Sequence, residues 1–237
     1  MHLAILMTNT DESDFAQRHP KDEQKFAELI QMARPDWTTT AYVVKDGQFP
    51  ETLDGLDGAM ITGSPASVLD DAPWIARLLD LVRDMHARRL PVFGACFGHQ
   101  AIALALGGSI GRNPGGWVHG LTRNRILERP DWTRDLPDEV RLYGSHMEQV
   151  TALPQGARVI AEGPDCPVTG FVLGQHIYTT QHHPEMTHDF VEALTEEMAE
   201  ELGEEICARA LASLAHPSDM DAFAESIARF FEQARPE

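Results

Sequence analysis

The sequence is poor in cysteine and in basic residues. Its three cysteines, Cys96, Cys166 and Cys207, are widely spaced and odd in number. A disulfide framework and a structural zinc site therefore have no support. Lysine and arginine number 19 against 37 aspartate and glutamate residues, which gives a formal net charge of -18. Because such an acidic surface repels phosphate backbones, we expect no nucleic-acid partner.

Long hydrophobic runs are also missing. No uninterrupted apolar stretch approaches the roughly 20 residues needed to span a bilayer, so no membrane partner is expected. The N-terminal run MHLAILMTNT has no basic leader or cleavage site and is more typical of a first strand than of a signal peptide. The default location is therefore the cytoplasm. Apolar residues make up 43% and charged residues 24%, the balance of a globular protein.

Short apolar runs alternate with helical patterns in the first half of the chain. The expected strands are Leu3–Thr8, Thr39–Val44, Gly58–Thr62 and Pro91–Ala95. The expected helices are Gln24–Met32, Pro73–Arg89 and Ala101–Leu106. This alternation indicates an α/β fold with a mostly parallel central sheet flanked by helices.

The second half is expected to extend this sheet and then become helical. Residues 112–148 indicate loops with short strands, and the runs Ala157–Glu162, Val168–Leu173 and His176–Thr180 indicate an antiparallel addition. From Thr187 the pattern is helical, with Ser218 and Asp221 spaced as a capping box for the last helix. We therefore expect one main domain over residues 1–187 and a C-terminal helical extension over 188–237 that packs on it.

The most informative segment is Pro91–Gln100, in which an apolar strand runs through Gly94-Ala95-Cys96-Phe97-Gly98 into a helix. This is the form of a nucleophile elbow, a sharp turn that exposes its central residue. Glycines fit on both sides because a side chain would collide with nearby backbone. The helix N-terminus favours a thiolate, and the N–H of Phe97 would point toward a forming oxyanion. The alternative is a buried structural cysteine, which is the interpretation for Cys166 and Cys207.

A thiol nucleophile needs a base, and the segment Gln181-His182-His183-Pro184-Glu185 offers one. The proline stiffens the backbone, so His183 and Glu185 can project to the same side, which suits a carboxylate that orients an imidazole. A metal cluster of His182, His183 and Glu185 is the alternative. It lacks a metalloprotease spacing or another ligand group, so no metal is expected.

The two segments together resemble the class I (triad-type) glutamine amidotransferase family, and in particular its stand-alone GMP-synthase-like members. The resemblance covers roughly residues 40–187. It implies a flavodoxin-like fold, Cys96 as nucleophile, His183 as base and then acid, and Glu185 as the third member of the triad. It also implies that the backbone N–H of Gly63 completes an oxyanion hole with Phe97, and it implies no cofactor.

Further positions follow from the same resemblance. Gln100 and the segment Ser145-His146-Met147 are similar to family residues that hold the amino-acid head of glutamine. Glu148 stands where the family has aspartate, and Val118 where it has glutamate. These departures concern the substrate pocket and leave the triad intact.

The implied activity is release of ammonia from the side-chain amide of glutamine through a cysteinyl thioester. A synthetase subunit is then a possible partner that receives the ammonia. A γ-glutamyl peptidase, which would use the same triad on a γ-glutamyl compound, is the first alternative. A non-catalytic regulatory or binding module is the second, although its expected mark is a damaged triad.

Overall fold

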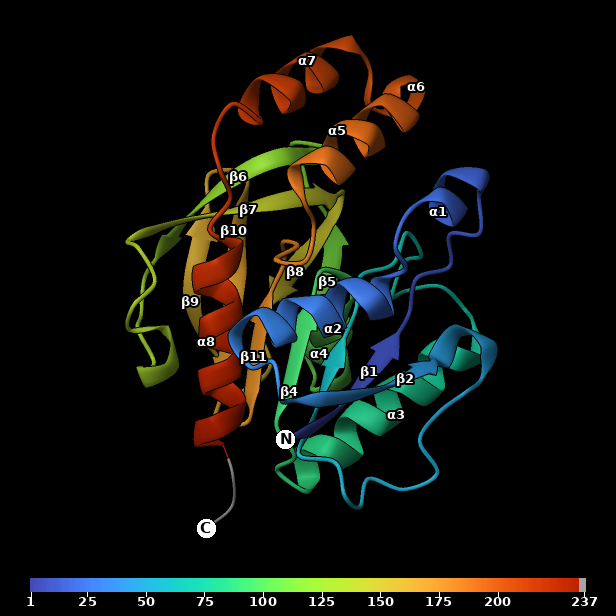
Figure 1. The fold of residues 1–237 in the computed structure, drawn as a ribbon, viewed down its shortest axis with the longest axis vertical. Helices are drawn as coiled ribbons and strands as arrows, with labels where there is room; N and C mark the ends of the chain where they lie inside the picture. The colour runs from blue at the N-terminus through green and yellow to red at the C-terminus, as the bar shows by residue number, and fades with distance from the viewer. Residues whose placement is uncertain (235–237) are drawn as a thin grey trace.

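The computed structural model describes residues 1–234, which form a nine-stranded sheet with helices on both faces (Figure 1). The parallel part of the sheet has the order β2, β1, β3, β4, β11. These strands are β1 His2–Met7, β2 Thr38–Val43, β3 Gly58–Ile61, β4 Val92–Ala95 and β11 Ile177–Thr180. This is the flavodoxin-like strand order, so the expected α/β class is confirmed.

Four antiparallel strands continue the sheet beyond β11 in the order β10, β9, β6, β7. Their bounds are β6 Val118–Ile126, β7 Glu139–His146, β9 Arg158–Gly163 and β10 Cys166–Leu173, while β5 Ser109–Arg112 and β8 Glu148–Ala152 form a separate two-stranded sheet. The expectation of loops with short strands over residues 112–148 is wrong, because β6 has nine residues and β7 eight. The sequence hides β6 because its buried position between the exposed Arg123 and Arg125 is held by Asn124 and not by an apolar residue. The length of the two strands follows from their pairing with each other.

Helices cover the two faces of the sheet and bury a separate core on each. Phe26 of α2 and Phe230 of α8 belong to the core on one face, whereas Leu78 of α3 and Ile102 of α4 belong to the core on the other. The helices are α1 Asp14–Arg18, α2 Asp22–Ala33, α3 Pro73–Ala87, α4 Phe97–Ala105, α5 His188–Glu197, α6 Ala199–Leu202, α7 Glu204–Ser213 and α8 Met220–Gln233, with single 3-10 turns at η1 Val44–Asp46 and η2 Asp131–Thr133.

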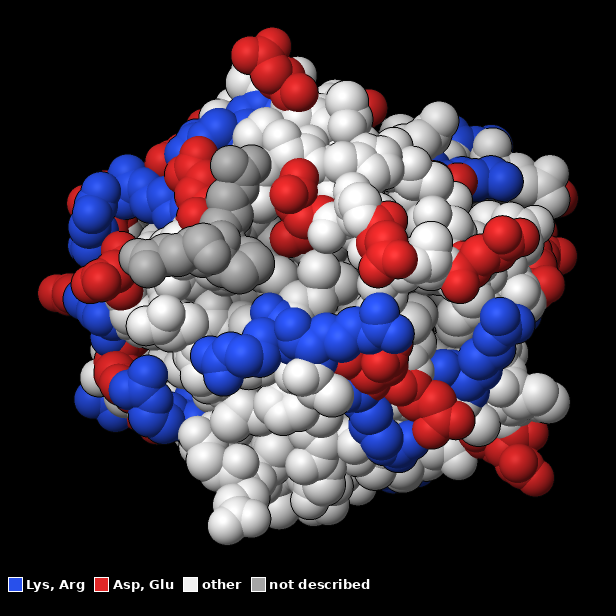
Figure 2. Space-filling view, turned by 90° about the horizontal axis from the view of Figure 1, so that it is seen from below, with Lys and Arg blue, Asp and Glu red and all other residues white. Residues whose placement is uncertain are grey.

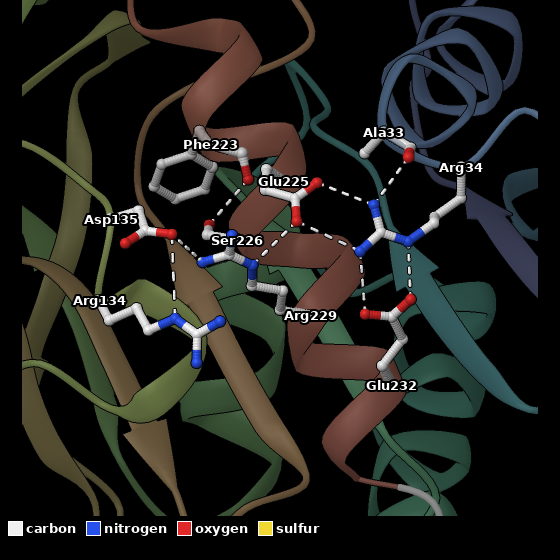
Figure 3. Close-up of polar contacts among 9 residues, drawn as sticks. All are labelled: Ala33, Arg34, Arg134, Asp135, Phe223, Glu225, Ser226, Arg229 and Glu232. Carbon is white, nitrogen blue, oxygen red and sulfur yellow. Dashed lines mark hydrogen bonds and ion pairs between the residues drawn. The ribbon is translucent and has the colours of Figure 1, made fainter.

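Helix α8 is held by its apolar face and by a charged network along its exposed side. Phe223, Ile227 and Phe231 are buried against the sheet. Figure 3 shows Arg34, at the end of α2, between Glu225 and Glu232, with Oε–nitrogen distances of 2.8 and 2.6 Å. Such exposed pairs each stabilise by about 1 kcal/mol or less, so apolar burial contributes most of the attachment.

The expected capping box at the start of α8 is not formed. The helix begins at Met220 with Asp219 as its N-cap residue, and no side chain caps it. The carboxylate of Asp219 instead accepts a hydrogen bond of 2.7 Å from the backbone N–H of Arg141 on β7. A tertiary contact has therefore taken the place of the local one.

Helices α5, α6 and α7 lie together beyond the edge formed by β6 and β7 (Figure 1). The contact of α7 with β6 is close, because a Cβ at Gly120 would lie 2.8 Å from the Cα of Ala210. Ser213 of α7 also accepts a hydrogen bond of 2.8 Å from the backbone N–H of Leu121. These contacts fix the C-terminal helices to the strand that leads toward the candidate site.

The charge on the molecule is unevenly arranged. In the view of Figure 2, basic and acidic side chains are interspersed on one face. By contrast, the segment 188–213 holds eight acidic residues and a single arginine, Arg209. None of the helices within residues 1–234 is both long and apolar enough to cross a membrane.

Candidate active site

Cys96 lies at the sharp turn between β4 and α4, at the carboxyl edge of the parallel strands. Its backbone has φ 50° and ψ -106°, a strained conformation that costs a non-glycine residue about 1–3 kcal/mol. Backbone hydrogen bonds hold the turn, since Cys96 N–H donates to Thr180 and Gly98 N–H to Thr62 at 2.9 and 3.2 Å. The strain persists because the surrounding strands determine the path of the chain.

The glycines on both sides of the turn are required by close packing. A Cβ at Gly98 would lie 2.4 Å from the backbone oxygen of Ile61, and one at Gly94 would lie 2.7 Å from the backbone of Gly98. Neither distance is tolerable for a carbon atom. Both expected collisions of the elbow are therefore present in the structure.

His183 and Glu185 lie next to each other in the segment after β11. The Nδ1 atom of His183 is 2.7 Å from an Oε atom of Glu185, and both side chains are buried. The backbone N–H of His183 donates to Tyr143 on β7 at 2.8 Å, which fixes the segment. The Nε2 atom of His183 has no hydrogen-bond partner among residues 1–234. The second ring nitrogen is therefore left for a reacting group.

The electrostatic surroundings favour a charged His183. Burial by itself lowers the pKa of the imidazole, but Glu185 and the Cys96 sulfur outweigh burial and raise the pKa well above its ordinary value. An imidazolium at this position can both stabilise a neighbouring thiolate and donate a proton.

Gly63 brings these groups together from β3. A Cβ at Gly63 would lie 2.7 Å from Cε1 of His183 and 3.7 Å from Cβ of Cys96, so only glycine leaves room between them. Thr8 fixes this turn, because its hydroxyl lies 2.9 Å from the carbonyl oxygen of Gly63. Phe97 is the first residue of α4, and its N–H has no acceptor within the helix.

The residues expected to hold the head of the substrate lie nearby, with different partners. Gln100 donates from Nε2 to the backbone oxygen of Glu148 at 2.9 Å and to Gln181 at 3.2 Å. Ser145 contacts His119 at 3.2 Å, and the sulfur of Met147 lies 3.2 Å from a guanidinium nitrogen of Arg112. Of these residues, Gln100 is therefore linked most directly to Cys96.

Sequence reasoning missed Gln181. Its side-chain nitrogen lies 3.8 Å from the sulfur of Cys96, and its oxygen accepts from Gln100. The available signal was its position two residues before His183, in the segment that directly follows β11.

His146 and His182 form a buried pair beside the site. Their Nε2 atoms are 3.4 Å apart, and His182 is 1% exposed. Since His182 contacts His146 while His183 contacts Glu185, the set of His182, His183 and Glu185 does not converge on one point. Within residues 1–234 no group of three or more histidine, cysteine or acidic side chains could hold a metal ion.

Comparison with known proteins identifies the family of this chain. The family model for class-I glutamine amidotransferases matches residues 28–194, more than half of the chain. The protein belongs to this family. A glutamine amidotransferase-like protein of Schizosaccharomyces pombe is 28% identical over 97% of this chain and 98% of that protein.

Other members of the family differ in their described activities. Gamma-glutamyl peptidase 3 of Arabidopsis thaliana is 34% identical over 62% of this chain, a match that spans 63% of that peptidase's length. A glutamine-hydrolysing GMP synthase subunit of Thermococcus kodakarensis is 38% identical over 42% of this chain and 53% of that protein. A glutamine amidotransferase structure from Thermotoga maritima has a TM-score of 0.79, with 18% identity and 98% coverage of both chains, which shows the fold.

The elbow at Cys96 gives a stability prediction. We expect Gly98→Ala to lower the free energy of unfolding by about 2 kcal/mol or more, because its Cβ meets backbone that cannot rotate away. Urea unfolding measures the change. Gly115→Ala is the matched control, since its Cβ would lie 3.5 Å from the nearest atom and should change stability by about 0.5 kcal/mol or less. Equal effects of the two substitutions would contradict the steric explanation.

The buried histidines give a second prediction. Burial lowers the pKa of His99 to about 3 and those of His119 and His146 to about 4, so all three are neutral in the folded chain. The unfolded chain binds protons at these positions below its ordinary histidine pKa of about 6.5. The contribution of these neutral histidines to the free energy of unfolding is therefore fully present above pH 6.5. It is lost as the pH falls toward 4, because the unfolded chain then binds protons that the folded chain does not.

We expect the free energy of unfolding to fall by up to about 1.4 kcal/mol per pH unit for each such histidine. Urea midpoints measured between pH 7.5 and 4.5 give this slope. His99→Gln should reduce the slope, because this buried imidazole can no longer take up a proton on unfolding. A slope that is the same in the parent and in His99→Gln would refute the assignment.

Proposed function

We propose that this amidotransferase-family protein hydrolyses the side-chain amide of glutamine through a cysteinyl thioester. The observation that carries the proposal is the convergence of Cys96, Gly63 and the His183–Glu185 pair at one edge of the sheet. In this proposal the triad is Cys96, His183 and Glu185. The 2.7 Å contact between His183 and Glu185 supports this assignment, because a triad needs a carboxylate that orients the imidazole.

The first half of the reaction forms the thioester. The thiolate of Cys96 attacks the γ-carbonyl carbon and forms a carbon–sulfur bond. His183 then gives its proton to the amide nitrogen as the carbon–nitrogen bond breaks, and ammonia leaves. The raised pKa of His183 supplies the protonated imidazole at the start of this half-reaction.

The second half consumes water. His183, now neutral, takes a proton from water as the oxygen attacks the thioester carbon. The carbon–sulfur bond breaks, glutamate leaves, and the proton on His183 restores the starting state. Glu185 keeps the imidazole oriented throughout, because its carboxylate contacts Nδ1.

The oxyanion of both tetrahedral intermediates would be held by the N–H groups of Gly63 and Phe97. Each such donor is worth about 3 kcal/mol of barrier. We further propose that Gln100 and the segment 145–147 contact the amino-acid head of the substrate. Gln181, which lies between Gln100 and Cys96, would align the two.

A γ-glutamyl peptidase is the second candidate, supported by the similarity to gamma-glutamyl peptidase 3. Only the leaving group differs, since His183 would protonate a peptide amine instead of ammonia. The similarity to a GMP synthase subunit supports a different fate for the ammonia, which a synthetase subunit would receive.

The decisive experiment offers the purified protein glutamine and a series of γ-glutamyl dipeptides and measures glutamate, ammonia and free amine. Release of glutamate and ammonia from glutamine supports the main proposal, and release from dipeptides alone supports the peptidase. Failure to turn over any substrate, together with failure of a glutamine-like electrophile to label Cys96, would refute both.

A further inference from the structure

A cavity of about 220 Å³ lies between strand β6, the turn joining β9 to β10, and helix α7. His182, the direct neighbour of His183, forms part of its wall together with Cys166 and His119. These three side chains are 1–6% exposed and form the buried end. Arg123, Arg209 and Asp165 also line the cavity and are exposed, so they form its rim.

Helix α7 is fixed so that Arg209 stands at this rim. Strand β6 approaches α7 at Gly120, where a Cβ would lie 2.8 Å from the Cα of Ala210. The hydroxyl of Ser213 accepts from Leu121 at 2.8 Å, one turn further along the helix. Arg209 directly precedes Ala210, so the backbone that carries it is held against β6.

The charge of Arg209 is conspicuous in its surroundings. It is the single lysine or arginine in residues 188–213, which contain eight acidic residues. Even so, Arg209 makes no ion pair with any residue of the described part of the chain, and neither does Asp165 across the rim. Arg123 pairs only with the exposed Glu139, at 3.5 Å. The rim therefore presents one cation and one anion without internal partners.

The buried end carries no charge. Burial lowers the pKa of His119 to about 4 and that of His182 well below its ordinary value, and it raises the pKa of the Cys166 thiol to about 12. Their hydrogen-bonding atoms are also engaged, since His119 contacts Thr195 at 2.9 Å and His182 contacts Thr122 at 3.1 Å. A ligand would thus meet charges at the rim and neutral groups deeper in the cavity.

We propose that this cavity binds a small amino acid or dipeptide, with its carboxylate on Arg209 and its ammonium group on Asp165. A cavity of this size suits such a compound rather than a drug-sized ligand, whose pockets begin at about 300 Å³. The ligand has two possible sources. It is either the amine released from a γ-glutamyl peptide, a source that rests on the proposed function, or a separate effector.

The test measures the binding of glycylglycine to the Cys96→Ala protein by calorimetry. Because this variant lacks the proposed nucleophile, the binding result does not depend on whether the proposed reaction occurs. We expect saturable binding that Arg209→Gln and Asp165→Asn each weaken about tenfold or more, as for loss of a charge-assisted hydrogen bond. Glycylglycinamide, which lacks the carboxylate, should bind as weakly as glycylglycine binds to the Arg209→Gln protein. Arg88→Gln, which replaces an exposed arginine at the C-cap of α3, is the control and should bind like the parent.

Two kinetic experiments on proteins that retain Cys96 distinguish the two possible sources of the ligand. If the ligand is the released amine, Arg209→Gln raises KM for a γ-glutamyl dipeptide more than KM for glutamine. If it is an effector, glycylglycine changes the rate of glutamine turnover without competing with glutamine. Absence of saturable binding, or binding that is equal in the Arg209→Gln, Asp165→Asn and Arg88→Gln proteins, would overturn the proposal.

Discussion

Replacing Cys96 with alanine is expected to reduce turnover of any γ-glutamyl substrate by at least about 10⁴-fold, the scale on which loss of a nucleophile acts in other triad enzymes. The physical reason is that the substitution removes the attacking thiol of the proposed reaction, and that the other buried thiol, Cys166, is a poor replacement. Burial keeps the pKa of Cys166 at about 12, so this thiol remains protonated. Glutamate release, followed with a coupled assay, measures the effect.

Cys207→Ala is the matched control for this substitution, because Cys207 is a half-buried thiol on α7. It should retain the parent rate. A glutamine-like electrophile followed by peptide mass analysis should modify Cys96 in both the parent and the control. Retention of more than about one hundredth of the parent rate by Cys96→Ala would contradict the proposed thioester, since the residual rate after loss of a nucleophile is far lower.

Replacing Glu185 with glutamine is expected to lower kcat by about 10²–10⁴-fold, as in triads whose orienting carboxylate becomes an amide. Glutamine keeps the shape of the side chain but removes its charge. Because Glu185 raises the pKa of His183 against the opposing effect of burial, its neutralisation should lower that pKa. The imidazolium is then lost at a lower pH, so the alkaline limb of the pH–rate profile should move toward acid.

The pH profile separates this electrostatic role from a merely structural one, which would reduce the rate without moving the limb. Glu192→Gln is the matched control, since Glu192 lies exposed on the nearby helix α5. It should change neither kcat nor the profile. If Glu185→Gln left the alkaline limb in place, the assignment of Glu185 to His183 would be wrong.

Local sequence patterns predicted the parallel half of the fold well. The apolar runs that became β1, β3 and β4 are short and each is followed by small or polar residues, so these strands are visible without tertiary information. The antiparallel half was less predictable. Strands β6 and β7 pair with each other along eight residues, and their exposed arginines hide that pairing from a single-sequence pattern.

The same contrast applies to individual residues around the site. The steric demand at Gly94 is confined to the elbow, because its Cβ would meet the backbone of Gly98, and such a demand leaves a readable motif. The demand at Gly98 comes from Ile61 on β3 and is a tertiary contact. The buried His146–His182 contact joins positions 36 residues apart, and the contact of Gln181 with Cys96 joins positions 85 apart. Neither has a local signature. The Gln181–Cys96 contact depends on the pairing of β11 with β4, and the His146–His182 contact depends on how the segment after β11 lies against β7.

The sequence by itself determined the chemistry expected of this protein, because a strand, two glycines and a cysteine at one turn admit few other conformations. It also indicated which histidine and glutamate can act together, since Pro184 limits how His183 and Glu185 are placed. The tertiary structure decided how far apart these groups lie and which charges they experience. It alone placed Arg209 over the cavity beside His182, because the approach of α7 to β6 depends on contacts about 90 residues apart in the chain.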